Sequence, residues 1–359
     1  MTNMRRRDFL SILGSTAAFA QRATNTIPLG LNTYCLRALR WHDLPLLDYT
    51  ASLKLDACFL QDSVDPGVMD PSHWAKVREH ARNLGLRLET GGGVFLPKSP
   101  EDFEPTVQTL ERNIDRAKAL GSPVVRCLIA GERATMPPGT VEQHMETAVK
   151  VLRRVRTRAL DAGLKLAVEN HKDLQAWATR EVIETAGKEF VGSYLDTGNP
   201  VFVAEDPMTT VEELGHLAVC VHLRDSVIYE HPKGIAVQWV PLGEGVNDFV
   251  KIVERVRQLC PPVALYVKPI TGRPPAVLPV YDDAFWRLFP KARSADFARF
   301  AALARKGRPY EKHVVIEDIP GRQTPEAFLP AVQYQQREHM ERSVEYAKKT
   351  LGLGVRWRG

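Results

Sequence analysis

Three short apolar runs, each followed at once by a side chain able to bind a metal ion, constrain the fold of this chain more than any other feature. The runs lead into Glu169, Asp196 and His222. These residues are 27 and 26 positions apart (196 − 169 and 222 − 196), which suits a strand, a loop and a crossover helix. If the strands are parallel neighbours, the three side chains lie at one end of one sheet. Two carboxylates and an imidazole there predict a site for Mn²⁺, Mg²⁺, Co²⁺ or Zn²⁺.

Strand-like and helix-like segments alternate along most of the chain. Eight strands are predicted, at residues 27–32, 57–61, 86–89, 124–129, 164–168, 191–195, 217–221 and 263–268. Strands that alternate with single helices pair in parallel, and eight of them predict a closed (β/α)8 TIM barrel of the α/β class. A doubly wound open sheet is the structural alternative.

The chain divides into three predicted regions. Residues 1–20 are interpreted as a signal peptide, 27–275 as the barrel and 276–359 as a C-terminal helical extension. The extension includes a long helix with a polar face at 333–351 and is expected to pack outside the barrel or over its mouth. An insertion at 227–240, after the seventh strand, is long for a strand–helix loop and is expected to form a flap.

The N-terminus carries a twin-arginine pattern. Arg6 and Arg7 precede an apolar stretch at 9–19, and Ala18-Phe19-Ala20 provides a small-x-small cleavage site. This pattern predicts export of a folded protein to the periplasm. The apolar stretch is too short for a permanent membrane span, and no other stretch is long enough. A net charge of +5 on 359 residues gives no case for a nucleic-acid partner.

The segments at the predicted strand ends show a family resemblance. They read AVENH, YLDTGN, VHLRD and PLGEG, and they resemble the sugar phosphate isomerase/epimerase family of xylose isomerase-like TIM barrels. Such enzymes hold a divalent metal with Glu, Asp, His and a second Glu from strands five to eight. The resemblance implies that Glu169, Asp196 and His222 are the first three ligands, and that Glu169 is also the first catalytic base.

Further residues have candidate roles around this centre. The expected substrate-binding residues are His171, Asn199, Arg224, Arg273 and Glu89, and the expected supporting residues behind the ligands are Asp225 and Glu244. Each also has a structural alternative, such as a satisfied buried histidine, a solvated ion pair or a loop-forming carboxylate. The expected partner is a small carbohydrate.

The fourth ligand position departs from the family pattern, because Lys268 stands there. A charged ammonium cannot bind a metal and repels a cation. Three alternatives follow. The metal keeps three protein ligands and water; Lys268 is itself a catalytic base with a lowered pKa; or Lys268 forms a salt bridge to Glu169 or Asp196 in place of the metal.

The expected activity is a metal-dependent isomerisation or epimerisation of a sugar or keto-sugar, by proton abstraction next to a carbonyl. The alternatives are a β-eliminating lyase acting on a 3-keto-glycoside and a catalytically degenerate carbohydrate-binding barrel. A trinuclear zinc nuclease of the same fold is disfavoured. Asn199 stands where such nucleases have a histidine, and the second and third strands are expected to end in Gln61 and Glu89.

Overall fold

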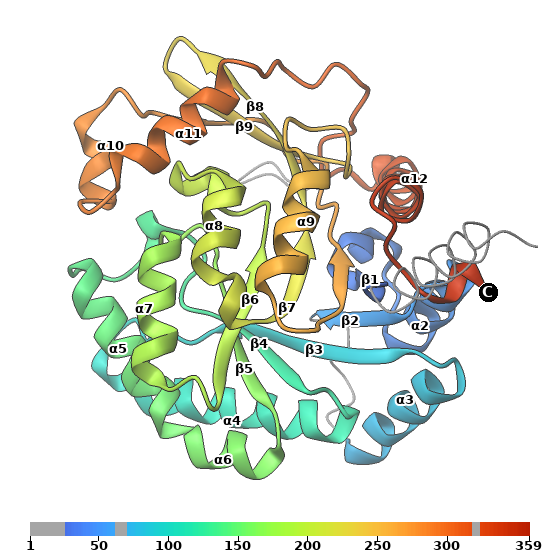
Figure 1. Cartoon of the computed structure of the whole chain (residues 1–359). Coiled ribbons are helices and arrows are strands. Elements are labelled where there is room, and N and C mark those ends of the chain that lie inside the picture. Colours follow the sequence, from blue (N-terminus) through green and yellow to red (C-terminus); the bar gives the residue numbers. More distant parts are fainter. Residues whose placement is uncertain (1–25, 62–69, 318–323) are drawn as a thin grey trace, which may run out of the picture.

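The computed structural model describes residues 26–61, 70–317 and 324–359, and a closed barrel of eight parallel strands forms its centre (Figure 1). Around the barrel the strands follow the order β1-β10-β7-β6-β5-β4-β3-β2. Their bounds are β1 Leu29–Asn32, β2 Ala57–Gln61, β3 Arg87–Val94, β4 Val124–Leu128, β5 Lys165–Glu169, β6 Val191–Asp196, β7 Ala218–Leu223 and β10 Leu265–Val267. The predicted (β/α)8 TIM barrel is therefore confirmed. The twin-arginine segment lies outside the described residues.

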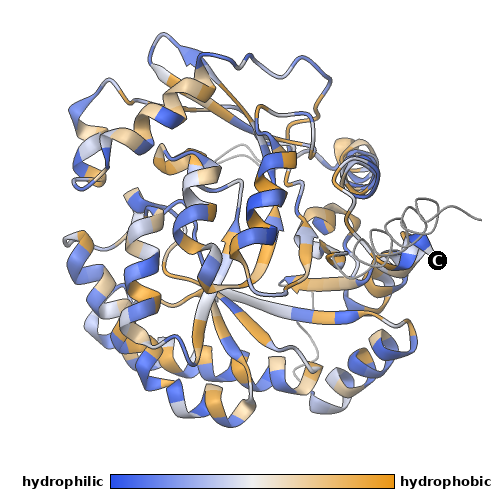
Figure 2. Ribbon diagram, viewed as in Figure 1, coloured by the Kyte–Doolittle hydropathy of each residue, from blue (hydrophilic) through white to orange (hydrophobic). Residues whose placement is uncertain are grey.

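Helices surround the barrel and cover its outer face (Figure 1). They are α2 Asp43–Ser52, α3 Pro71–Asn83, α4 Phe103–Leu120, α5 Val141–Arg154, α6 Arg156–Ala162, α7 Ala176–Ala186, α8 Pro207–Leu214 and α9 Phe249–Leu259. Figure 2 shows apolar residues along the barrel strands and polar residues on the outward sides of these helices. In the described ranges, none of the helices combines the length and the apolar character that crossing a membrane requires.

The third strand is longer than the sequence predicts, because it continues through the glycines that follow Glu89. Gly91 pairs with Arg126 of β4, and its φ of 140° is a conformation that other residues rarely adopt. A Cβ atom at this position would lie 2.2 Å from the backbone nitrogen of Arg126. The glycine thus allows β3 to pack closely against β4, where a side chain would force the strands apart.

The insertion after β7 is an ordered sheet. Strands β8 (Asp225–His231) and β9 (Gly234–Val240) pair antiparallel, and β11 (Ala276–Leu278) adds to the other edge of β9. Helices α10 (Asp283–Leu288) and α11 (Ser294–Ala304) pack against this sheet around a separate apolar core. The first part of the C-terminal extension therefore fixes the predicted flap as a rigid wall beside the barrel.

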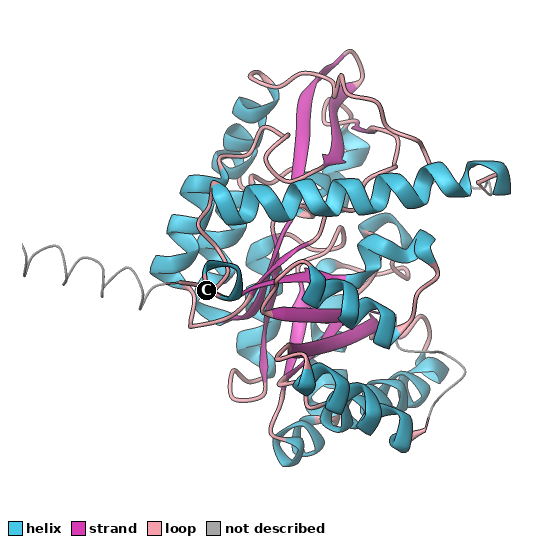
Figure 3. Ribbon diagram, turned by 90° about the vertical axis from the view of Figure 1, so that its right-hand side faces the viewer, coloured by secondary structure: helices cyan, strands magenta, loops and turns pink. Residues whose placement is uncertain are grey.

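The second part of the extension closes the outer ring. Helix α12 (Leu329–Lys349) is long and lies along the side of the barrel (Figure 3). Its Met340, Val344 and Ala347 belong to the same apolar core as the barrel strands β1 and β10. Beyond α12, the backbone nitrogen of Gly354 donates to Ile27, next to the first strand. One part of the extension thus lies beside the mouth of the barrel, and the other part packs on the outside.

Alternation along the strands determines which side chains point into the barrel. An inner layer contains Phe59, Tyr194, Cys220 and Tyr266 among its members. Two residues further along β6 comes Asp196, and two residues beyond Tyr266 comes Lys268. The same spacing along β4 leads from the inner Val124 to Arg126. The layer above the aromatic residues is therefore charged, at the carboxyl ends of the strands.

Candidate functional site

Five charged side chains converge at the carboxyl end of the barrel and form what we call the charged cluster: Arg126, Glu169, Asp196, Arg224 and Lys268. They come from β4, β5 and β6, from the residue after β7 and from the residue after β10. Every side chain in the cluster is at most 4% exposed. Two carboxylates and three positively charged side chains thus lie next to one another, buried from solvent.

Lys268 joins the two carboxylates directly. Its Nζ lies 3.0 Å from Oε1 of Glu169 and 3.0 Å from Oδ2 of Asp196. Its third donor contact is the hydroxyl of Tyr194, at 3.1 Å. An ammonium has three hydrogens to donate, so these contacts satisfy it completely. The arrangement matches the alternative in which Lys268 forms a salt bridge to Glu169 and Asp196 in place of a metal.

The carboxylate oxygens of Glu169 and Asp196 also accept hydrogen bonds from other residues. Oε2 of Glu169 accepts from Nε of Arg126, and Oε1 accepts from the side-chain amide of Asn199 at 2.9 Å. Oδ2 of Asp196 accepts from Arg224 at 2.6 Å, while Oδ1 accepts from the backbone nitrogen of Gly198 at 2.8 Å. All four carboxylate oxygens therefore have partners.

Gly198 makes the approach of Arg224 possible. A Cβ atom on this residue would lie 2.5–2.7 Å from the Cβ, Cγ and Cδ atoms of Arg224. Those atoms belong to the inner part of the arginine side chain, which cannot easily move aside. The backbone oxygen of Gly198 accepts from Nε1 of Trp239 at 2.6 Å, and the guanidinium of Arg224 lies 4.2 Å from the indole centroid. Trp239 thus lies directly against the cluster.

His222 lies among aromatic rings. Its imidazole stacks on Tyr194 with centroids 4.0 Å apart and on Tyr266 at 4.8 Å, with Phe59 edge-on at 4.8 Å. Its Nε2 makes no hydrogen bond to any described residue, and Nδ1 lies 3.5 Å from the amide nitrogen of Asn32. Burial, reinforced by the charge of Lys268, holds the pKa of His222 well below its ordinary value, so the ring is neutral.

The ionisation of the cluster follows from burial and from its ion pairs. Burial alone would raise the pKa of Glu169, but Arg126 and Lys268 outweigh it and hold that pKa well below its ordinary range. Burial lowers the pKa of Lys268, and the carboxylates of Glu169 and Asp196 oppose this shift. A carboxylate with such a low pKa is a weak base.

These residues do not fit a divalent cation as they are arranged. Lys268 Nζ occupies the point between Glu169 and Asp196, and three positive side chains against two negative ones would repel a metal ion. Among residues 26–61, 70–317 and 324–359, no group of three or more His, Cys, Asp or Glu side chains is placed to hold a metal. The ammonium of Lys268 therefore pairs with the two carboxylates that the sequence pattern predicts as metal ligands.

Two candidate residues expected to support metal ligands serve a neighbouring loop. Asp225 is buried and accepts from the backbone nitrogens of Gly243 and Gly245 and from the amide of Asn247, at 2.9–3.0 Å. Burial raises its pKa to about 6. Glu244 pairs with Arg342 and Lys312 on α12 and on the preceding segment, at 2.8 and 3.1 Å. Their contacts fix the loop after β9 and do not orient His222.

Two of the expected substrate-binding residues have structural partners. Glu89 is fully buried on β3, pairs with Arg87 at 2.7 Å, and has its pKa raised by burial to about 7. His171 has its Nδ1 2.5 Å from the carbonyl oxygen of Gly131, and burial lowers its pKa to about 4. Neither lines the cavity described next.

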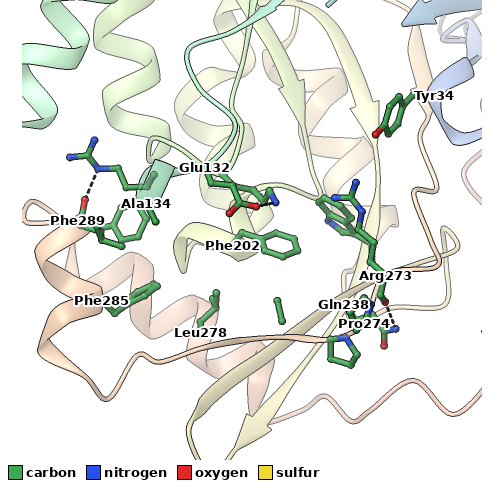
Figure 4. Close-up of a pocket in the computed structure, with 16 residues that line it drawn as sticks. Tyr34, Glu132, Ala134, Phe202, Gln238, Arg273, Pro274, Leu278, Phe285 and Phe289 are labelled. Carbon is green, nitrogen blue, oxygen red and sulfur yellow. Dashed lines mark hydrogen bonds and ion pairs between the residues drawn. The ribbon is translucent and has the colours of Figure 1, made fainter. Parts of the chain in front are cut away.

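A cavity of about 680 Å³ opens among the loops that follow the barrel strands, and we call it the mouth pocket (Figure 4). Its lining comes from the loops after β1, β4, β5, β6 and β10, from β9 and β11, and from α10. Arg273, one of the expected substrate-binding residues, lines the pocket, with its guanidinium 5.1 Å from the Trp239 centroid. The other four expected substrate-binding residues, His171, Asn199, Arg224 and Glu89, do not line it. Trp239 separates Arg224 from the pocket.

Sequence reasoning missed two kinds of residue. Arg126 is a single charge inside an apolar strand, two positions from an inward-facing valine, and that pattern could have identified it. Trp239, Phe202 and Lys172 reach the pocket through the arrangement of the loops and the insertion. No local pattern in the sequence signals that arrangement.

Comparison with known proteins agrees with the fold. The family model described as xylose isomerase-like TIM barrel matches residues 47–260. A 3-oxo-isoapionate decarboxylase of Pectobacterium atrosepticum is 24% identical over 245 residues, covering 68% of this chain and 79% of the relative.

Solved structures show the same architecture. D-psicose 3-epimerase with D-tagatose from Clostridium cellulolyticum H10 superposes with a TM-score of 0.56 at 16% identity, covering 77% of this chain and 96% of that one. A protein from Mycobacterium smegmatis in complex with magnesium gives a TM-score of 0.52 at 16% identity, covering 75% and 97%. The relatives thus include sugar-modifying enzymes and a metal-bound barrel, and this chain belongs to the xylose isomerase-like TIM barrel family.

Proposed function

We propose that this protein binds a carbohydrate in the mouth pocket without a divalent metal, because Lys268 neutralises the carboxylates that would bind the ion. The observation that carries the proposal is the position of the Lys268 ammonium, 3.0 Å from both Glu169 and Asp196. Kinship with sugar-modifying enzymes supports a carbohydrate ligand.

The composition of the mouth pocket suits a sugar. Its volume of about 680 Å³ falls in the usual range for small-molecule sites, about 300–1,000 Å³. Arg273, Lys172 and Gln238 offer donors for hydroxyl or carboxylate oxygens, and the aromatic rings of Trp239 and Phe202 offer apolar surface. Lys172 also pairs with Glu132, which keeps its ammonium beside the cavity.

The second candidate is the isomerase or epimerase activity expected from the sequence, with the β-eliminating lyase as its variant. The observation that favours it is the relationship to a sugar epimerase and a decarboxylase. In this scheme Glu169 would remove a proton next to a substrate carbonyl. Trp239 would first have to move, since it lies between the cluster and the pocket, and Lys268 would have to release Glu169.

Metal titration separates these candidates. The purified protein, dialysed and then equilibrated with excess Mn²⁺ or Zn²⁺, is expected to hold no stoichiometric ion by elemental analysis. Lys268→Glu should bind about one ion, because the change adds a carboxylate and removes a positive charge. Lys268→Gln is the matched control and should not bind. Stoichiometric metal in the wild type, lost in Asp196→Ala, would overturn the proposal and support the metal-dependent activity.

We also propose that the protein works after export by the twin-arginine route, as Arg6 and Arg7 suggest. Replacing both with lysine should retain the full-length chain in the cytoplasm, as cell fractionation would show. Normal export and processing of the double variant would contradict this.

A further inference from the structure

The mouth pocket has two chemically different ends (Figure 4). Toward one end lie Arg273, Gln238 and Tyr34, which offer hydrogen-bonding groups. Leu278, Phe285 and Phe289 lie toward the opposite end. Leu288 adds to this apolar wall, and Arg133, which also lines the pocket, donates from its Nε to the carbonyl oxygen of Leu288 at 3.0 Å. A ligand that fills the whole cavity therefore meets hydrogen-bonding groups at one end and mainly apolar side chains at the other.

The apolar end of the pocket comes from the C-terminal extension. The residues of the apolar end belong to β11, α10 and the residue after α10, all beyond the stretch 47–260 that the family model matches. The aromatic and charged residues Phe202, Trp239 and Lys172 lie within that stretch. The apolar end thus comes from a part of the chain that the family model does not match.

The apolar wall is fixed in position. Leu278, Phe285 and Phe289 are only 7–8% exposed and pack in one apolar core with Ile228 and Val237 of the β8–β9 hairpin. The pairing of β11 with β9 holds the wall from behind. Because these side chains are already ordered, a ligand that covers them releases water without a large ordering cost.

We infer that the carbohydrate bound in the mouth pocket carries an aryl substituent, as an aryl glycoside does, with the sugar near Arg273 and the aromatic group against Phe285 and Phe289. This inference rests on the proposed carbohydrate-binding function. A free sugar would leave the apolar wall in contact with water, whereas an aromatic group would cover it and could pack edge-to-face with the phenylalanine rings.

Strand β11 offers a matched pair of variants. Ala276 and Leu278 line the cavity, and Val277 between them does not, since side chains alternate along a strand. Val277 is 37% exposed and faces away. Ala276→Asp therefore places a charge in the pocket beside the apolar wall, and Val277→Asp places the same charge outside it.

The test compares 4-nitrophenyl β-D-glucopyranoside with methyl β-D-glucopyranoside by isothermal titration calorimetry on the full chain. The aryl glycoside should bind at least about tenfold more tightly, the effect of burying one aromatic ring. Ala276→Asp should remove most of that advantage. Val277→Asp should bind both as the wild type does.

The outcomes distinguish a failure of the aryl inference from a failure of the proposed carbohydrate binding. Equal affinity for the two glycosides, or an equal loss of the aryl preference in Val277→Asp, would overturn the aryl inference and leave carbohydrate binding intact. Binding of neither glycoside, or tight binding of 4-nitrophenol without any gain from the sugar, would overturn carbohydrate binding itself.

Discussion

The charged cluster and the mouth pocket lie on either side of Trp239, and they are built in opposite ways. In the cluster, each carboxylate oxygen of Glu169 and Asp196 has a partner within the protein. In the pocket, Arg273 and Lys172 lie beside a cavity of about 680 Å³. The comparison teaches that buried carboxylates at the strand ends can be fully paired within the protein while charged side chains farther out line an open cavity.

The difference has an energetic basis. A buried charge is costly unless its partners remain in place, so loss of one member of the cluster leaves the others uncompensated. A charge at the pocket margin keeps access to water and contributes little to folding. We therefore expect stability to depend on the cluster and ligand affinity to depend on the pocket.

The largest expected effect comes from Lys268→Ala. It leaves Glu169 and Asp196 without the ammonium that joins them and should lower the free energy of unfolding by about 3–5 kcal/mol. Urea denaturation measures the loss. Arg273→Ala, the control in the pocket, should cost less than about 1 kcal/mol. Similar costs for the two variants would break the comparison.

The second prediction concerns coupling inside the cluster. Glu169→Gln and Lys268→Met should each destabilise the protein, but the double variant should be less destabilised than the sum, with a coupling energy of about 1–3 kcal/mol. The physical reason is that the second change removes the charge that the first one left uncompensated, while an amide oxygen can still accept from Arg126. Strictly additive denaturation energies would show that Glu169 and Lys268 do not stabilise each other.

A third prediction contrasts Glu169 with a buried carboxyl outside the cluster. Glu205 has an Oε1 without a hydrogen-bond partner among the described residues, and burial raises its pKa to about 8. Because the folded state holds the proton of this carboxyl more tightly than the unfolded state does, raising the pH destabilises the fold. The stability is highest below the ordinary pKa of a glutamate and falls as the pH rises toward 8. Glu205→Gln should therefore stabilise the protein at pH 9 by up to about 4 kcal/mol and have little effect at pH 4.

Glu169 should show the opposite pH dependence. Its pKa is lowered, so its contribution is present above the ordinary pKa of a glutamate and is lost as pH falls through the lowered value. Thermal unfolding of the wild type, Glu169→Gln and Glu205→Gln across pH 3–9 measures both effects. Parallel curves for the two variants would mean that the cluster does not keep Glu169 ionised.

The last prediction concerns Arg273→Ala, which should change the stability of the protein least and its affinity for a sugar most. Arg273→Ala should weaken binding of methyl β-D-glucopyranoside about tenfold, the worth of one charge-assisted hydrogen bond, with an almost unchanged melting temperature. The control is Arg255→Ala on α9, whose guanidinium contacts Gln258 outside the pocket at 3.0 Å. Unchanged affinity in Arg273→Ala would place the sugar elsewhere in the cavity.

The sequence by itself determined the barrel and the position of the cluster. Strand and helix segments alternate locally, and Glu169, Asp196 and His222 follow three strands at nearly equal spacing, so parallel pairing brings them to one end. It also identified Lys268 as the departure from the family pattern. These features depend on local periodicity, which a single sequence displays directly.

Tertiary structure alone decided what the cluster does and where the pocket lies. Which oxygen Lys268 contacts, and whether Trp239 lies between Arg224 and the cavity, depend on packing between segments far apart in the chain. The stacking of His222 between Tyr194 and Tyr266 likewise depends on the register of three strands. The apolar end of the pocket arises because β11 pairs with β9 across an intervening segment. Long-range pairing of this kind leaves no periodic trace in the sequence, because it is set by the total burial and charge balance of the folded chain.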